Sequence, residues 1–273
     1  MGGHVRTSRS IRYEPTATRR RMGARAAAKL ASVGLLAVSA TLALASGAQA
    51  ATSVPLGTAD SFAVLAGSTI TNTGATVVNG NLGLSPGSAV TGFPPGVVNG
   101  AQHVADGVAL QAKADLITAY IDAAGQGPAI PVTADLGGQT LTPGVYNSPT
   151  TLALTGVLTL DALGDPNAVF IFQAGSTLTT ASASSVNLIG GAQSRNVYWQ
   201  VGSSATLGTN SLFRGSILAL TSITLTTGAT ADGRVLALNG AVTLDTNGIT
   251  LPLNSASFTV AKVFSDDSPV RSV

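Results

Sequence analysis

A four-residue phrase recurs between residues 175 and 247, and it constrains the fold more than any other feature. Its copies are Thr177-Leu178-Thr179-Thr180, Thr206-Leu207-Gly208-Thr209, Thr224-Leu225-Thr226-Thr227 and Thr243-Leu244-Asp245-Thr246. Residues in an extended chain alternate faces, so each Leu should point inward while both of its neighbours point outward. The last three copies start at positions 206, 224 and 243, and each is followed by Asn or Gly, which favour tight bends. This nearly constant period predicts a β-solenoid whose stacked coils place threonines in rows about 4.8 Å apart.

The first 50 residues predict a secretion signal. A basic lead that includes Arg25 and Lys29 precedes the apolar run 30–45, and Ala48-Gln49-Ala50 is a small-x-small cleavage site. The alternative is a membrane anchor, but the run is shorter than the ~20 residues that a spanning helix needs. We therefore expect a secreted protein that begins near Ala51 and has no stable membrane insertion after cleavage.

Charge and cysteine content narrow the class of protein that follows the signal. Of the 14 basic residues 8 lie before position 51, whereas only Glu14 of the 12 acidic residues does, so the chain from Ala51 onward carries a net charge of −5. Nucleic acid is therefore an unsuitable partner. The chain has no cysteine, so its core must hold the fold without disulfides. We expect one domain over residues 51–264, with a last strand at 256–263 and a disordered tail at 265–273.

One long helix is predicted among the short apolar strands. Residues 101–124 contain no Pro, and their apolar side chains recur mostly three, four or seven positions apart. The apolar side would contain Val104, Val108, Leu110, Ala114, Ile117 and Ile121, and the wet side Asp106, Lys113, Asp115, Thr118 and Asp122. We expect the apolar side to cover one face of the solenoid, because that surface would otherwise be exposed to water.

Groups for catalysis or metal binding are scarce after the signal. That part of the chain has one His, no Cys and no Glu, and His103 has no motif around it, which indicates a surface residue. Asp161 and Asp165 are typical of a turn, with a calcium site as the alternative. Trp199 is expected in the core rather than as a sugar-stacking platform. We therefore predict no enzyme, no cofactor and no bound metal.

Threonine is abundant where charge is rare. It occupies 29 positions after Ala50, an abundance that β propensity explains in part. Propensity does not explain why the charged residues of 175–253 are limited to Arg195, Arg214, Asp232, Arg234 and Asp245. A row of Thr combines a rigid χ1, a methyl and a hydroxyl that donates and accepts. Such an array is suited to ordered water.

Four segments of the chain carry a resemblance to a known family: 56–69 (LGTADSFAVLAGST), 141–146 (LTPGVY), 167–173 (NAVFIFQ) and 199–209 (WQVGSSATLGT). They resemble the microbial ice-binding protein family that is often labelled DUF3494. The resemblance covers nearly all of residues 56–252. It implies an all-β-dominated fold, a discontinuous right-handed β-solenoid of triangular cross-section, with one long helix packed along a face.

The resemblance also implies ice binding through a flat face with Thr-(Ala/Gly)-x-(Thr/Asn) motifs. The motif occurs at 73–76 (TGAT) and 227–230 (TGAT), with looser versions at 180–183 and 246–250. The expected ice-binding residues are Thr73, Thr76, Thr180, Thr209, Thr227, Thr230, Thr246 and Thr250. The main hypothesis is a secreted, monomeric antifreeze-like protein that inhibits ice growth and recrystallisation. The alternatives are an extracellular structural or adhesive solenoid without ice activity and a polysaccharide-active β-helix enzyme.

Overall fold

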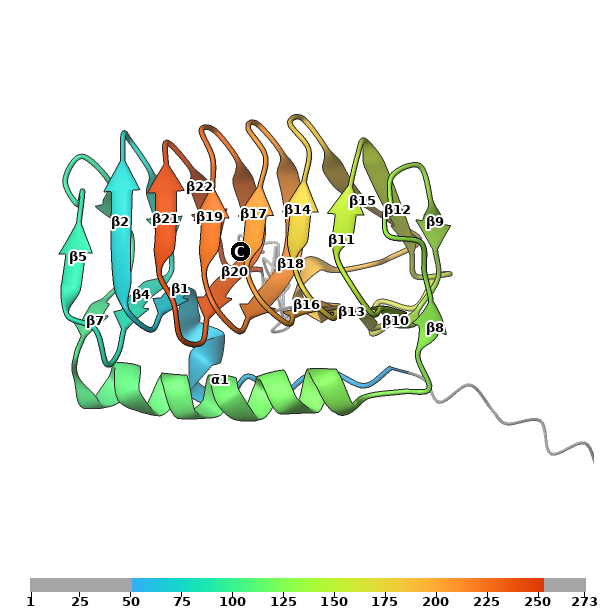
Figure 1. Ribbon diagram of the computed structural model, residues 1–273, viewed down its shortest axis with the longest axis horizontal. Helices are drawn as coiled ribbons and strands as arrows, with labels where there is room; N and C mark the ends of the chain where they lie inside the picture. Colours follow the sequence, from blue (N-terminus) through green and yellow to red (C-terminus); the bar gives the residue numbers. More distant parts are fainter. Residues whose placement is uncertain (1–50, 253–273) are drawn as a thin grey trace, which may run out of the picture. The chain divides into compact units, whose positions relative to one another are not determined.

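The computed structural model describes residues 51–252. The expected signal at 1–50, the possible strand at 256–263 and the tail at 265–273 lie outside the described residues. Within them, short parallel strands stack into a solenoid whose coils present three faces, and one long helix lies along one of these faces (Figure 1).

The first face is a separate seven-stranded parallel sheet, called here the threonine face. Its strands are short because each crosses one side of a coil and ends where the chain bends to the next side. Their order along the solenoid is β11 (Leu152–Leu154), β14 (Leu178–Thr180), β17 (Ala205–Leu207), β19 (Ile223–Leu225), β21 (Val242–Asp245), β2 (Thr69–Thr73) and β5 (Ala89–Thr91).

The other two faces share a fifteen-stranded sheet, because the long strands β18 (Leu212–Ala219) and β20 (Thr230–Ala237) bend from one face to the other. The face beneath the helix, the helix face, adds β8 (Ile130–Pro131), β10 (Gly144–Ser148), β13 (Phe170–Ala174), β16 (Val197–Val201), β1 (Phe62–Ala66), β4 (Asn81–Leu84) and β7 (Gln102–Val104). The third, the mixed face, adds β9 (Thr140–Leu141), β12 (Val157–Asp161), β15 (Ser185–Ile189), β22 (Gly248–Thr250), β3 (Val77–Asn79) and β6 (Val97–Val98).

The order of the strands along the solenoid differs from their order in the chain. β2 pairs with β21, and β1 pairs with β20, so the N-terminal coils stack on the last C-terminal coil. The chain reaches one end of the stack at β7, and its next strand, β8, lies at the other end. Eight strand spacings of about 4.8 Å separate these ends, and a helix rising about 1.5 Å per residue covers most of that distance. The predicted discontinuous solenoid with one helix is confirmed.

The interior of the coils is filled by inward-facing aliphatic and aromatic side chains. Four aromatic rings lie on successive coils. The first two pairs are stacked, with centroid distances of 5.4 Å for Tyr146 and Phe172 and 4.1 Å for Phe172 and Trp199, and the third pair, Trp199 and Phe213, is tilted by 47° at 5.0 Å. Trp199 is 1% exposed, and its Nε1 donates a hydrogen bond to the carbonyl of Arg214 at 3.0 Å. The prediction that Trp199 belongs to the core is confirmed.

Helix α1 (Gly107–Gly125) begins later than predicted. Residues 102–104 pair with β4 as strand β7, and Asp106 caps the helix by accepting a hydrogen bond from the backbone N–H of Ala109 at 2.8 Å. The expected start at residue 101 is therefore wrong, because pairing with an open sheet edge competes with helix formation there. His103 lies in β7 rather than in the helix, and its ring contacts that of Phe62 at 5.6 Å.

The side of α1 that packs on the solenoid is also not the predicted one. Val108, Leu110, Ile117 and Ile121 are 48%, 63%, 50% and 65% exposed. The buried residues of the helix are mostly small, namely Ala109, Ala112, Lys113, Leu116, Ala119 and Ala123. The large outward side chains of the helix face already fill the space between the layers, so the helix approaches through its alanines.

Lys113, expected on the wet side of the helix, is 7% exposed. Its Nζ donates hydrogen bonds to the carbonyl oxygens of Ala237 and Leu238, at the end of β20. Burial lowers the pKa of the Lys113 ammonium to about 8, because no carboxylate among its hydrogen-bond partners offsets the loss of water. This contact joins the N-terminal half of the helix to the end of β20.

Candidate functional site

The threonine face carries a straight row of six threonines, one per strand, called here the central row. Register pairs Thr179 with Thr206, Thr206 with Thr224 and Thr224 with Thr243, and the row continues onto the N-terminal coils. Its members, in order along the solenoid, are Thr179, Thr206, Thr224, Thr243, Thr71 and Thr91. Ala153 of β11 occupies the same position at one end of the row.

The alternation of the strands explains why all six point outward. The residues on either side of Thr206, Thr224 and Thr243 are buried apolar side chains, such as Ile223 and Leu225 around Thr224. Because the strands are parallel and in register, neighbouring members of the row are about 4.8 Å apart. Within the described part of the chain, the six hydroxyls have no hydrogen-bond partner in the protein. They are therefore available to water.

Hydroxyls at the outward positions beside the central row are less available to water, because several of them form hydrogen bonds within the protein. On one side, Thr151 and Thr177 bond to each other at 3.0 Å, and the Oγ of Ser222 accepts from the backbone N–H of Ala241 at 3.2 Å. On the other side, the Oγ1 of Thr226 donates to the carbonyl of Leu207 at 2.8 Å. These contacts stiffen the coils on either side of the row.

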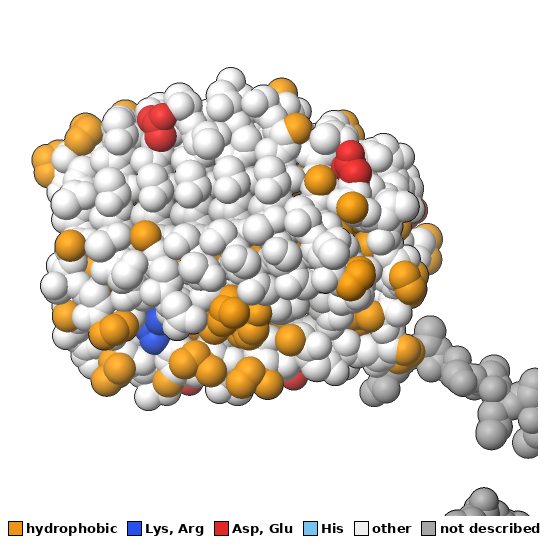
Figure 2. Space-filling view, in the orientation of Figure 1, with side chains coloured by type: hydrophobic (Ala, Val, Ile, Leu, Met, Phe, Trp, Pro, Cys, Tyr) orange, Lys and Arg blue, Asp and Glu red, His pale blue; other side chains and the backbone are white. Residues whose placement is uncertain are grey.

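Charge is almost absent from this face. Figure 2 shows regular files of side chains that are neither charged nor hydrophobic over most of the sheet, with the hydrophobic side chains concentrated toward the helix. Among the outward-facing residues of the seven strands, Asp245 is the one that carries a charge. An uncharged, flat array of free hydroxyls and methyl groups can hold water in a regular pattern.

The eight threonines expected from sequence do not form one surface. Thr73 ends β2 on the threonine face and is exposed, and Thr209, Thr227 and Thr246 lie in the turns beyond the sheet. Thr227 donates its hydroxyl to Asp245, and Thr246 has a φ of 56°, which marks a tight bend. These four lie at or beyond one edge of the threonine face.

The remaining four belong elsewhere. Thr76 and Thr180 are 0% and 3% exposed, and their hydroxyl oxygens accept backbone hydrogen bonds from Asn247 and Gly208. Burial excludes direct contact of these two side chains with ice. Thr230 begins β20 and Thr250 ends β22, so both lie on the mixed face. The Thr-Gly-x-Thr phrases at 73–76 and 227–230 therefore span the bend from the threonine face toward the mixed face.

The expected ice-binding residues include no member of the central row, because they come mainly from the Thr-(Ala/Gly)-x-(Thr/Asn) motifs, which the structure places around the bend. Alignment of the repeated phrases by their letters also misplaces the first phrase. Leu178 pairs with Ala205 rather than with Leu207, so the first phrase is displaced by two positions from the second. Because side chains alternate with period two, this displacement keeps a Thr outward but changes which one joins the row. Thr71 and Thr91 belong to N-terminal coils that carry no such phrase. Their own alternation, as in Thr69-Ile70-Thr71, was the available signal.

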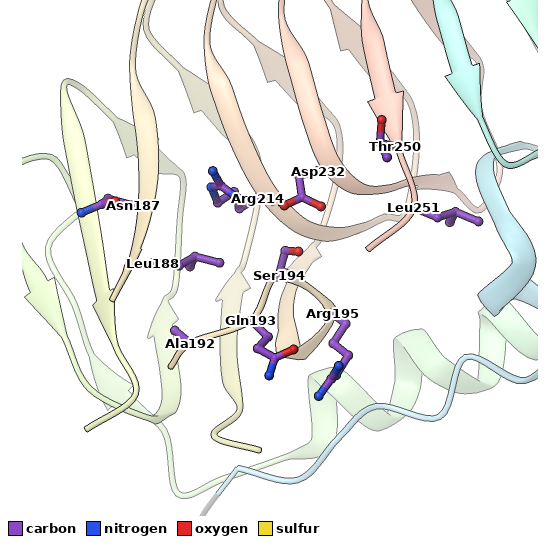
Figure 3. Close-up of a pocket in the computed structure, with 10 residues that line it drawn as sticks. All are labelled: Asn187, Leu188, Ala192, Gln193, Ser194, Arg195, Arg214, Asp232, Thr250 and Leu251. Atoms are coloured by element: carbon purple, nitrogen blue, oxygen red, sulfur yellow. Dashed lines mark hydrogen bonds and ion pairs between the residues drawn. The ribbon is translucent and has the colours of Figure 1, made fainter. Parts of the chain in front are cut away.

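A cavity of about 570 Å³ on the mixed face is the second candidate (Figure 3). It lies between β15, β18, β20 and β22 and the loop around Ser194, and its lining includes Asn187, Arg214, Asp232 and Thr250. Arg214 and Asp232 point toward each other, with 2.8 Å between Nη1 and Oδ2. Asp232 is the one carboxylate that lines this cavity in the described chain, whereas glycosidase chemistry uses a pair.

Asp161 and Asp165 form turn hydrogen bonds, as the sequence predicts. Asp161 and Asp165 accept hydrogen bonds from the backbone N–H groups of Leu163 and Asn167 at 2.9 and 2.8 Å, which is turn geometry. Residues 51–252 contain no cluster of three His, Cys, Asp or Glu side chains that could hold a metal ion. In the same range there is no helix with the length and apolar character needed to cross a membrane.

Comparison with known proteins places this geometry in a family. The model of the family described as ice-binding-like matches residues 64–250. The chain belongs to the ice-binding-like family. Members include the ice-binding protein of Nostoc sp. (strain HG1), which is 56% identical over 217 residues, covering 79% of this chain and 80% of that protein. The ice-binding protein of Flavobacterium frigoris (strain PS1) is 36% identical, covering 73% and 76% of the two chains.

Solved structures of ice-binding-like proteins share the fold. An ice-binding protein from an Antarctic biological consortium superposes with a TM-score of 0.74 and 53% identity, covering 75% of this chain and 93% of that one. The ice-binding protein of the Antarctic ascomycete Antarctomyces psychrotrophicus gives a TM-score of 0.72 and 45% identity, covering 75% and 100%. The predicted family and fold class are confirmed.

Proposed function

We propose that this protein is secreted and binds ice through the threonine face, restraining the growth and recrystallisation of ice outside the cell. The observation that carries the proposal is the in-register central row, whose hydroxyls have no partner among residues 51–252. The names of its relatives support ice as the partner.

The row fits a crystalline partner for three physical reasons. Its spacing repeats at about 4.8 Å, which is close to a repeat of the ice lattice. Threonine has a restricted χ1, so little side-chain entropy is lost when water becomes ordered against it. The solenoid beneath is closely packed, with Ile223, Leu225 and Val242 at 1% exposure or less, so the row is held straight before ice arrives.

Thr224→Tyr tests the proposal, because this residue stands in the middle of the row. An aromatic ring would break the flat surface but suits a strand, so folding should be retained. The matched control is Thr250→Tyr, the same change at an exposed strand position on the mixed face. We expect thermal hysteresis and inhibition of recrystallisation to fall by about tenfold in Thr224→Tyr, a loss of about 1.4 kcal/mol in adsorption, and to be unchanged in the control.

The outcomes separate the competing functions. An inactive parent protein with intact circular dichroism would favour the structural or adhesive module. An active parent with equal loss in both variants would mean that the threonine face is not the site. Hydrolysis or elimination on a panel of polysaccharides, abolished by Asp232→Asn in the mixed-face cavity, would favour the enzyme.

Secretion and a monomeric state complete the proposal. The leader in residues 1–50 supports export, and cleavage after Ala50 would leave Ala51 as the first residue. Mass spectrometry of the culture supernatant should find this N-terminus, and recovery of the intact chain in membranes would contradict it. Sedimentation of the exported chain should give one species near the monomer mass at micromolar concentration.

A further inference from the structure

We propose that Asp245 limits the ice affinity of the threonine face and that replacing its carboxylate strengthens binding. This inference rests on the proposed function of the same face. Asp245 is the last residue of β21, two positions after Thr243 of the central row, and it therefore points outward from the same sheet. It stands in the outward row next to the central one, paired with Thr73 of β2.

The position of Asp245 is surrounded by residues suited to the face. Thr73 of β2 pairs with Asp245, and Thr226, the residue after β19, lies two positions past Thr224, the partner of Thr243. A Thr at 245 would therefore continue a line of threonines beside the central row. The carboxylate has no cationic partner, since the described ion pairs are those of His103 with Asp106, Arg214 with Asp232 and Arg234 with Asp60. It is therefore an isolated charge within an uncharged array.

An isolated carboxylate works against adsorption to ice in two ways. It binds its own hydration water strongly and orients it toward the charge, and that water must be rearranged or removed when the face meets a lattice. It also takes hydroxyls from the surface, because Thr227 and Thr246 both donate to its oxygens, the latter at 3.1 Å. The edge of the face then presents a hydrated anion.

Asp245 has a structural role that the test must separate from this effect. Its hydrogen bonds hold the turns on two successive coils, at Thr227 and at Thr246. Asp245→Asn keeps an amide oxygen that can accept one of these bonds while removing the charge. Asp245→Thr removes the charge and continues the row. Thermal unfolding reports the loss of turn contacts, whereas ice activity reports the charge.

The experiment measures thermal hysteresis at equal protein concentration for the parent, Asp245→Asn and Asp245→Thr, each checked by circular dichroism. The matched control is Asp165→Asn, which removes one negative charge from an exposed turn outside the sheet, where the carboxylate accepts a hydrogen bond from the backbone N–H of Asn167. We expect a rise of roughly twofold in Asp245→Asn, since removing an unpaired charge lowers the desolvation cost. The rise should be larger in Asp245→Thr and absent in the control.

Each outcome supports or contradicts the proposed effect of Asp245 on ice affinity. An active parent with unchanged or reduced activity in a folded Asp245→Asn overturns the inference and leaves the proposed function standing. An inactive parent overturns both. A rise in Asp165→Asn equal to that in Asp245→Asn would show an effect of net charge rather than of position, and it would also overturn the inference. If Asp245→Thr fails to fold, Asp245→Asn decides alone.

Discussion

The threonine face and the helix face are two sides of the same coils, with the same parallel pairing and the same alternation of side chains. They differ in what points outward. The helix face presents apolar side chains such as Ile171, Leu218 and Leu236, which lie in one buried cluster with Leu116 of α1. The threonine face presents the central row and has no covering layer among residues 51–252. The outward residues of a solenoid therefore decide whether a face is covered or free to act.

The largest expected effect comes from placing a charge beneath the helix. Leu116→Asp would bury an unpaired carboxylate between α1 and the sheet, and we expect a loss of several kcal/mol, on the order of 3 to 5, in the free energy of unfolding. The adjacent Ile117→Asp is the matched control, because Ile117 is half exposed and should cost less than about 1 kcal/mol. Urea denaturation measures both. Equal losses would mean that the helix has been assigned the wrong buried side.

A smaller effect is expected from Lys113, whose charge is already buried between α1 and the helix face. The folded-state pKa of Lys113 is about 8 and lies below the ordinary value of 10.5, so between these values the unfolded state binds more protons than the folded state. Stability should therefore rise as the pH increases from 7.5 to 9.5, by about 1 to 2 kcal/mol from this group. In Lys113→Met this contribution should disappear. Denaturation curves of the parent and Lys113→Met at both pH values measure this contribution. An identical pH dependence in the two proteins would contradict the lowered pKa of Lys113.

On the threonine face we expect changes in activity with little change in stability. Thr224→Val keeps the branched shape and the rigid χ1 but loses the hydroxyl, whereas Thr224→Ser keeps the hydroxyl and loses the methyl and its restriction. If the row acts mainly by shape, Thr224→Val should retain most of the thermal hysteresis and Thr224→Ser should lose about half or more. Both should unfold within about 0.5 kcal/mol of the parent. The reverse order would make hydrogen bonding the dominant contact.

The smallest effect is expected at the end of the row. Ala153→Thr on β11 would add a seventh threonine in register with Thr179. We expect a slight gain in recrystallisation inhibition and a stability change within about 0.5 kcal/mol, since the position is partly exposed. A loss of activity would show that the row does not act at that end of the face.

Much of the fold could be predicted because strand alternation is local. The outward and inward positions around Leu178, Leu225 and Leu244 follow from the sequence alone, and so does the burial of Trp199. The register between coils could not be read in the same way, because insertions in the turns shift one phrase relative to the next. The membership of Thr179 in the central row therefore depends on the pairing of Leu178 with Ala205, which no single strand contains.

The prediction of which side of α1 is buried was wrong for a different reason. Large apolar side chains were weighed more heavily than small ones, although Ala109, Ala112, Leu116, Ala119 and Ala123 recur at alternating spacings of three and four. Which stripe packs depends on the surface opposite, and the helix face is already bulky. A sequence pattern on one element does not contain that information. The predicted start of the helix was wrong for a similar reason, because β7 forms by pairing with β4, a separate strand earlier in the chain.

The stacking of N-terminal strands on the last C-terminal coil has a consequence for how the chain reaches this state. Val64 pairs with Val235 and Ile70 with Val242, so the middle of the solenoid closes only after nearly the whole domain has been synthesised. Such distant pairing requires a large loop-closure entropy before any contact compensates for it, which slows folding. The same closure leaves β21 and β22 between earlier coils, so the C-terminal strands cannot peel away one at a time from an open end.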